Sequence, residues 1–294
     1  MIARYRRGAI AALSSARGFV VVARGEGGGG AGRGKALSHT AMTAVQFLAH
    51  RGTSLAYAAI AGTGPLTVFL PGYMSDMTGT KAQALADWAT AHGRAFLRLD
   101  YSGCGASGGE FLDGSIGRWS DDAGAVIDAV IDRVAPGARV VLVGSSMGGW
   151  IALRLGAALG GRLAGLVGIA AAPDFTDWGL AMTAADQRAL AAQGWFTRPS
   201  AHDPAGYRYS RAFIADAAHA RLLGGDIAIT APVRLLHGQC DDAVPWRISL
   251  DIAARLRSAD VQVTLVKDGD HRLSRPEDQR LLLAAVAALT GEGP

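Results

Sequence analysis

Cysteine is scarce in this sequence of 294 residues, which contains only Cys104 and Cys240. Two thiols are too few for a disulfide framework, and neither has the spacing of a zinc site, so we expect a reducing compartment and no metal. No uninterrupted apolar run approaches the roughly 18 residues that cross a membrane, so we expect no stable membrane insertion. Half of the residues are hydrophobic and 18% are charged, which excludes a largely disordered chain.

Net charge is also small once the N-terminal segment is set aside. Residues 1–41 carry six Arg and one Lys against the single acid Glu26. Subtracting this charge of +6 from the total of +4 leaves the other 253 residues near −2. Nucleic acid requires a concentrated basic surface, which this body does not supply, so we exclude nucleic-acid partners.

Residues 1–42 differ in composition from the rest of the chain. Arg17 interrupts the apolar stretch that a secretory signal needs, and no clean cleavage site follows it. We interpret 1–42 as a disordered basic leader, or as sequence upstream of a true start at Met42, and 43–294 as one domain. We expect a cytoplasmic protein, with mitochondria as the alternative if this Arg-rich, acid-poor segment is a transit peptide.

From Thr43 onward, short apolar runs alternate with helix-like segments. The first two runs, 44–50 and 54–61, are separated by a Gly-containing turn, which predicts an antiparallel hairpin. The later alternation predicts an α/β fold: a mostly parallel, eight-stranded sheet with helices on both faces. Ser274 and Glu277 predict a capping box at the start of the last helix. The six further predicted strands are 66–70, 94–99, 139–143, 163–171, 233–236 and 261–266.

The alternation breaks between about residues 173 and 225. This interval is too long for an ordinary crossover, so we predict a small helical cap inserted over the carboxyl ends of the strands. Two interpretations of its large apolar residues stay open: they line an acyl pocket, or they pack the cap onto the core. These residues are Trp178, Met182, Trp195, Phe196, Tyr207 and Tyr209.

Ser146 is the candidate nucleophile. It is the central residue of Gly144–Gly148, which matches the G-x-S-x-G pattern of a nucleophile elbow. The pattern alone is weak in a chain with 40 glycines, and Ser107 lies in a second match. An elbow needs a buried strand before the serine and a helix after it. Val140–Val143 is the predicted strand before Ser146, and the apolar segment after it is a plausible helix. Ser107 is instead followed by two glycines and has no helix after it.

A serine hydroxyl needs a base within hydrogen-bond reach and an acid that orients the base. His271 follows the last predicted strand and precedes the last helix, where the base belongs. Asp241 and Asp242 compete as the acid, and Asp241 is the one that matches H-G-x-x-D-x-x-V-P, the pattern that begins at His237. We interpret His237 itself as structural, satisfied by backbone groups. Asp270 and Arg272, beside the base, are interpreted as loop surface.

An oxyanion hole requires two N–H donors near the nucleophile. The amide of Met147, directly after Ser146, is the first candidate. The second is the amide of Tyr73, in the loop after the third predicted strand. Both donate through the main chain, so their side chains are free to pack or to line a pocket.

These motifs resemble the α/β-hydrolase superfamily, and within it the subgroup of the mitochondrial palmitoyl-protein thioesterase and acyl-glucuronide esterase with its bacterial relatives. The resemblance runs from about Thr43 to Leu289 and implies that Ser146, Asp241 and His271 are the charge-relay residues. Residues 1–42 match no part of it, so its mitochondrial address does not transfer, and the Ala-, Gly- and Arg-rich composition favours cytoplasm. The matching stretches are Leu70–Ala82, Asp100–Gly105, Val143–Trp150, Leu235–Gly238, Asp241–Asp242, Val244–Trp246 and Asp270–Arg272, of which Pro71–Ala82 and Gly144–Trp150 are the more distinctive.

We therefore expect a serine hydrolase that cleaves carboxylic esters or thioesters through an acyl-serine, without metal or cofactor. The resemblance implies an acyl-protein thioesterase or acyl-glucuronide esterase, with an acylated protein or a small molecule as substrate. The alternatives are a peptidase of the same fold and a non-catalytic binding protein. The acyl chain length and the oligomeric state stay open.

Overall fold

A computed structural model describes residues 19–20, 44–200 and 204–291. The predicted leader, 1–42, lies outside these ranges except for its residues 19–20, so that interpretation stays a prediction. Over the described ranges, no helix combines the length and the apolar character that crossing a membrane requires.

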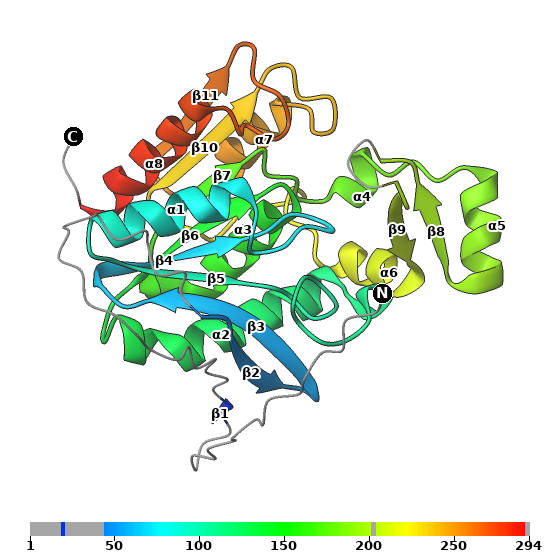
Figure 1. The fold of residues 1–294 in the computed structure, drawn as a ribbon. Helices are drawn as coiled ribbons and strands as arrows, with labels where there is room; N and C mark the ends of the chain where they lie inside the picture. Colours follow the sequence, from blue (N-terminus) through cyan, green and yellow to red (C-terminus); the bar gives the residue numbers. More distant parts are fainter. Residues whose placement is uncertain (1–18, 21–43, 201–203, 292–294) are drawn as a thin grey trace, which may run out of the picture.

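The main sheet contains all eight predicted strands and one short additional edge strand (Figure 1). Strands β4, β5, β6, β7, β10 and β11 run parallel to one another, whereas β1, β2 and β3 pair antiparallel, which confirms the mostly parallel sheet. In spatial order the strands are β1 (Phe19–Val20), β2 (Gln46–His50), β3 (Thr53–Ile60), β5 (Arg94–Leu99), β4 (Thr63–Leu70), β6 (Val140–Ser145), β7 (Leu163–Ile169), β10 (Val233–Gly238) and β11 (Val261–Val266).

Two hydrophobic layers cover the sheet, one on each face. Because successive strand side chains point to opposite faces, Val140 and Leu142 of β6 join one layer, and Val141 and Val143 join the other. Helices α1 (Thr80–Ala91) and α8 (Pro276–Thr290) pack on the second layer. The first layer is covered by α2 (Ile116–Val134), α3 (Met147–Leu159) and α7 (Arg247–Arg255). Two 3-10 turns, η1 (Phe111–Asp113) and η2 (Gly160–Arg162), complete the body.

The segment between β7 and β10 forms a cap beside the carboxyl ends of the strands, on the right in Figure 1. The cap contains helices, as predicted, and in addition a two-stranded antiparallel sheet that was not predicted. Aromatic residues, which favour strands, occur in both short strands and pair across them, as Phe196 does with Tyr209. The cap elements are α4 (Phe175–Trp178), α5 (Ala184–Gln193), β8 (Trp195–Arg198), β9 (Tyr207–Ser210) and α6 (Arg211–His219).

The start of α8 also differs from the prediction. A cap at Ser274 would make Arg275 the first helical residue, but the helix begins one residue later, at Pro276. Proline suits this first position because it lacks an N–H and its φ is fixed near the helical value. The cap residue is therefore Arg275, whose amide donates to the carboxylate of Asp278. The Arg275 guanidinium pairs with the same carboxylate, and Ser274 Oγ instead bonds to Arg272 O.

Ser107, the centre of the second G-x-S-x-G match, holds the loop after β5 against β3. Its Oγ accepts a hydrogen bond from Ala56 N at 2.8 Å and donates one to Asp100 O at 2.7 Å. Both partners are main-chain groups, and no helix follows Ser107 directly. The hydroxyl therefore joins two backbone segments and is not presented as a nucleophile.

We predict that Ser107→Ala lowers the free energy of unfolding by about 1–3 kcal/mol, because the buried Ala56 N–H loses its partner. Urea denaturation followed by circular dichroism measures this difference. A stability equal to that of the parent protein would contradict the structural role of the hydroxyl.

Candidate active site

Ser146 occupies a strained turn between β6 and α3. Its φ of 54° lies in the left-handed region, which non-glycine residues rarely adopt. Three backbone bonds hold this turn: Ser146 N donates to Ile169 O, and Ser146 O accepts from the amides of Gly149 and Ala172. The turn has the geometry of a nucleophile elbow, with a buried strand before the serine and a helix after it.

The flanking glycines are required by close backbone approach. A Cβ on Gly144 would lie 2.2 Å from Gly148 O, and one on Gly148 would lie 2.1 Å from Leu70 O. Neither position can hold a larger residue without movement of the main chain. The glycines of the motif therefore allow α3 to pack directly against the ends of β4 and β6.

The structure brings Asp241 and His271 together from two neighbouring loops. Asp241 follows β10 and His271 follows β11, and the two strands are parallel partners in the sheet. His271 Nδ1 lies 2.8 Å from Asp241 Oδ2, and the Asp241 side chain is fully buried. A carboxylate in this position orients the imidazole and favours the tautomer that leaves Nε2 free to accept a proton.

The choice of Asp241 over Asp242 has a structural basis. Asp241 Oδ1 accepts from the amides of Ala243 and Val244, and its Oδ2 accepts from His271 and His237. Asp242 is exposed at the rim of the same loop. The sequence pattern thus selected the carboxylate that the loop turns inward.

Burial acts to raise the pKa of Asp241, but hydrogen bonds from His237 and His271 outweigh it and hold this pKa well below its ordinary value. The group is therefore a carboxylate throughout the neutral range. A stable negative charge here favours a positive charge on His271 when that ring takes up a proton.

His237 is buried and only partly fits its prediction. Its ring contacts one backbone group, Val244 O, but also the side chains of Asp241 and Ser249. Asp270 likewise does more than lie on the surface, because its Oδ1 accepts from the amides of Arg272 and Leu273, next to His271.

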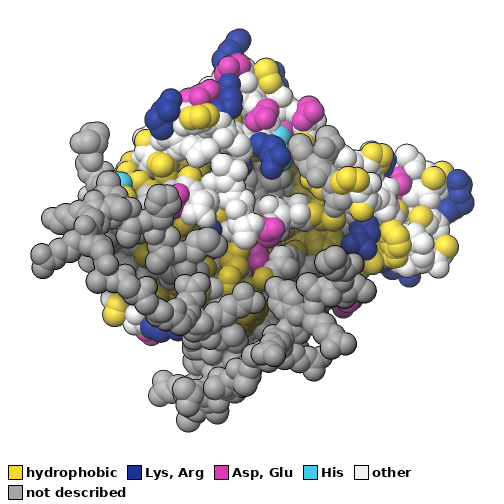
Figure 2. All heavy atoms as spheres, viewed as in Figure 1, with side chains coloured by type: hydrophobic (Ala, Val, Ile, Leu, Met, Phe, Trp, Pro, Cys, Tyr) yellow, Lys and Arg dark blue, Asp and Glu magenta, His cyan; other side chains and the backbone are white. Residues whose placement is uncertain are grey.

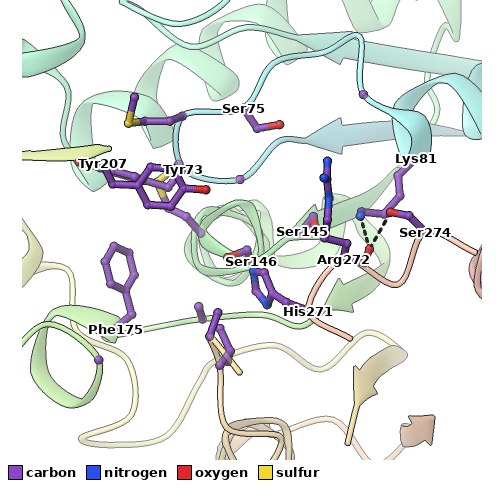
Figure 3. A pocket seen from close by; sticks show the side chains of 18 of the residues that line it. Tyr73, Ser75, Lys81, Ser145, Ser146, Phe175, Tyr207, His271, Arg272 and Ser274 are labelled. Carbon is purple, nitrogen blue, oxygen red and sulfur yellow. Dashed lines mark hydrogen bonds between the residues drawn. The ribbon is translucent and has the colours of Figure 1, made fainter. Parts of the chain in front are cut away.

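Ser146 and His271 both line one cavity of about 470 Å³ between the strand ends and the cap (Figure 3). The two side chains form no hydrogen bond with each other in this structure. Contacts of this kind are often long before substrate binds and tighten in the complex. The cavity volume is in the range of small-molecule sites, and we call this cavity the active-site pocket.

The two predicted oxyanion donors also lie at this pocket. Met147 is the first residue of α3, and a helix leaves its first amides without intrahelical partners. Tyr73 belongs to the loop after β4, and Gly72 beside it approaches Ser146 so closely that an added Cβ would lie 3.5 Å from Ser146 Cβ. Both residues therefore lie beside the same serine.

The side chain of Tyr73 packs toward the cap. Its ring stacks on that of Tyr209, with the ring centroids 5.0 Å apart, and its hydroxyl donates to Arg208 O at 2.5 Å. Burial raises the pKa of Tyr73 well above its ordinary value, so the hydroxyl keeps the proton that it donates. Met147 is buried in the core and also touches the pocket.

The open question about the cap aromatics has a mixed answer. Trp178, Tyr207 and Tyr209 line the pocket, as does Phe175, which the sequence interpretation did not single out. Phe196 is buried within the cap, and Met182 is exposed. Figure 2 shows hydrophobic side chains over part of the hollow between the body and the cap.

The opposite end of the pocket is polar, and its Lys81 was missed from the sequence. Burial lowers the pKa of Lys81 to about 8, and its Nζ donates to Arg272 O, beside His271 (Figure 3). Its presence in the distinctive stretch Pro71–Ala82 was the available signal. Arg272 and Ser274 line the same end.

Metal ligation has no support in the part of the chain that the structure describes. No group of three or more His, Cys, Asp or Glu side chains there has an arrangement that could hold an ion.

Comparison with known proteins gives concordant matches. Residues 67–285 match the model of the alpha/beta hydrolase family. The mitochondrial palmitoyl-protein thioesterase of Mus musculus is 40% identical over 236 residues, covering 79% of this chain and 77% of that protein. Its Homo sapiens counterpart is 37% identical over 235 residues, covering 79% and 75%.

Two solved structures are similar over most of their length. A protein of Agrobacterium vitis S4 has a TM-score of 0.78 at 39% identity, covering 84% of this chain and 98% of its own. The mouse alpha/beta hydrolase domain-containing protein 10 has a TM-score of 0.74 at 38% identity, with the same two coverages.

The low pKa of Asp241 predicts a pH-dependent contribution to stability. Because this pKa is lower in the folded than in the unfolded protein, the stabilisation is present above about pH 4 and is lost as the pH falls further. The gap in unfolding free energy between the parent protein and Asp241→Asn should shrink by about 1 kcal/mol between pH 5 and pH 3. Urea denaturation at the two pH values measures it, and an unchanged gap would contradict the assignment.

Proposed function

This chain belongs to the alpha/beta hydrolase family, and we propose that it is a serine hydrolase that cleaves carboxylic esters or thioesters through an acyl-serine intermediate. One observation carries the proposal: Ser146, on its strained turn, shares a pocket with a histidine that is hydrogen bonded to a buried aspartate. No observation favours a non-catalytic binding protein, because such a protein has no need of a strained serine beside a histidine–aspartate pair. Nothing specific favours a peptidase either.

In the proposed reaction, His271 Nε2 takes the proton of Ser146 as Oγ attacks the acyl carbonyl carbon. The carbonyl oxygen becomes an oxyanion, which the amides of Met147 and Tyr73 stabilise. His271 then gives its proton to the leaving alcohol or thiol as the carbon–heteroatom bond breaks. Water repeats the sequence on the acyl-serine, which releases the carboxylic acid and restores Ser146.

The two ends of the pocket suggest where the substrate lies. Phe175, Trp178, Tyr207 and Tyr209 offer an apolar surface on the cap side of Ser146, which suits an acyl chain. The polar end, with Lys81, then receives the leaving group. The curated relatives are named palmitoyl-protein thioesterases, so we propose acylated proteins or small acyl thioesters as substrates, with acyl glucuronides as further esters of the same reactivity.

The compartment is also a proposal. The curated relatives are named mitochondrial, which agrees with the alternative stated for the basic N-terminal segment. The Agrobacterium vitis protein is comparably similar, and a bacterial setting agrees with the cytoplasmic expectation.

We predict that Ser146→Ala lowers kcat for p-nitrophenyl esters and palmitoyl-CoA by at least about 10³-fold, because no nucleophile is left to form the acyl-enzyme. Spectrophotometric hydrolysis assays measure the rates, and a fluorophosphonate probe should label the parent protein but not the variant. Ser107→Ala is the matched control, since it keeps the elbow and should keep both activity and labelling. Equal hydrolysis by the parent and Ser146→Ala would refute the mechanism.

For Tyr207→Ala we predict a KM about tenfold higher for long-chain p-nitrophenyl esters, with an acetyl ester changed less than twofold. The reason is that the ring contributes apolar contact only to a chain long enough to reach it, a loss of about 1.4 kcal/mol. Steady-state kinetics across an acetyl-to-palmitoyl series measures this. Equal effects on short and long esters would place the acyl chain elsewhere.

A further inference from the structure

His237 has no part in the proposed reaction, yet it is fully buried directly behind Asp241. Both ring nitrogens have hydrogen-bond partners. Nδ1 lies 2.7 Å from Ser249 Oγ, a side chain on α7 that is itself buried. Nε2 lies 3.1 Å from Asp241 Oδ2 and 3.0 Å from Val244 O.

These partners determine the hydrogen positions on the ring. The carboxylate of Asp241 and the carbonyl of Val244 can only accept, so His237 Nε2 must carry a hydrogen. In the neutral ring Nδ1 is then an acceptor. The Ser249 hydroxyl, which can rotate, donates to it.

The same contacts determine how Asp241 is oriented. A carboxylate has about four lone-pair sites, and here Ala243 N and Val244 N occupy Oδ1 while His237 and His271 occupy Oδ2. Among the residues that the structure describes, His237 is thus the one side-chain donor to Asp241 that is not itself the proposed base. Losing it would leave part of a buried carboxylate unpaired and less strictly aimed at His271.

We propose that Ser249 and His237 are positioning residues for the proposed charge relay: the Ser249 hydroxyl donates to Nδ1 and holds the ring of His237 with its Nε2–H on Asp241 Oδ2, which in turn keeps that oxygen toward His271. This inference rests on the proposed function. Without the Ser249 hydroxyl, the buried Nδ1 of His237 has no hydrogen-bond donor. An unpaired buried acceptor is costly, so the ring moves to regain a partner, and its Nε2–H no longer holds Asp241 in one orientation.

The first test is Ser249→Ala, assayed with a p-nitrophenyl ester. We expect kcat to fall about tenfold while KM changes less than twofold, since the acyl pocket is untouched and only the orientation of the acid suffers. Ser120→Ala is the matched control, because Ser120 is also buried but bonds only to Ile116 O, the carbonyl one turn earlier in α2. It should keep kcat within twofold.

A double-mutant cycle tests whether Ser249 acts through the ring of His237. His237→Gln keeps an N–H donor toward Asp241 but removes the ring nitrogen to which Ser249 donates, so its effect on Asp241 should not depend on Ser249. In the His237→Gln background, Ser249→Ala should therefore lower kcat less than twofold. A tenfold loss in both backgrounds, or in neither, would overturn the proposal, whereas loss of activity in Ser146→Ala tests the proposed function separately.

Nitrogen-15 NMR of the parent protein supplies a readout that does not depend on any variant being active. The ring signals that disappear in His237→Gln identify His237. We expect hydrogen on Nε2 and none on Nδ1. A ring protonated on Nδ1, alone or together with Nε2, would overturn the role given to Ser249.

Discussion

The left-handed backbone at Ser146 is the constraint on which the rest of the site depends. A non-glycine residue in this conformation costs of order 1–3 kcal/mol, so the surrounding structure has to enforce it. Enforcement comes from Ile169 O, Gly149 N and Ala172 N, which are main-chain groups of β7, α3 and the loop after β7. Those groups lie in position because three central strands run parallel and end together, with their loops at one edge. The same edge carries Tyr73, Asp241 and His271, which is why a sheet built from apolar runs also assembles a polar site.

The sheet was largely predictable from the sequence, because strands covered on both faces are mostly apolar and therefore stand out as short hydrophobic runs. Val261–Val266 and Arg94–Leu99 have the bounds that their apolar runs predict, and β4, β6 and β10 differ only by a few terminal residues. The β8–β9 pair was not predictable in the same way. Its strands have four residues each, and they are stabilised by contact with Tyr73, which is distant in sequence. Such a segment shows aromatic content without a periodicity long enough to distinguish strand from helix.

The residues of the candidate site likewise fall into those that a local motif predicts and those that tertiary contacts bring in. Motifs within one short segment, such as Gly144–Gly148 and His237–Pro245, predict their site residues because the segment itself is the functional unit. Lys81 and Ser249 belong to helices that reach the site through tertiary packing, and no catalytic motif marks either residue, although Lys81 lies in the distinctive stretch Pro71–Ala82. The interpretation of His237 was incomplete for a related reason. Its position at the end of a strand could be recognised from the sequence, but its partner Ser249 lies twelve residues away on α7.

The two ways in which Tyr73 is held have a consequence for how this protein can change over evolution. Its amide belongs to the proposed oxyanion hole, while its hydroxyl and ring are bound by Arg208 O and Tyr209 of the cap. Cap and catalytic loop are therefore not independent modules, although the cap is a continuous insertion that could in principle be exchanged between relatives. A new cap that reshaped the acyl end would have to present a carbonyl and a flat ring at the same places. Diversification of substrate range in this lineage should thus proceed by substitutions around a retained β8–β9 hairpin rather than by replacement of the whole cap.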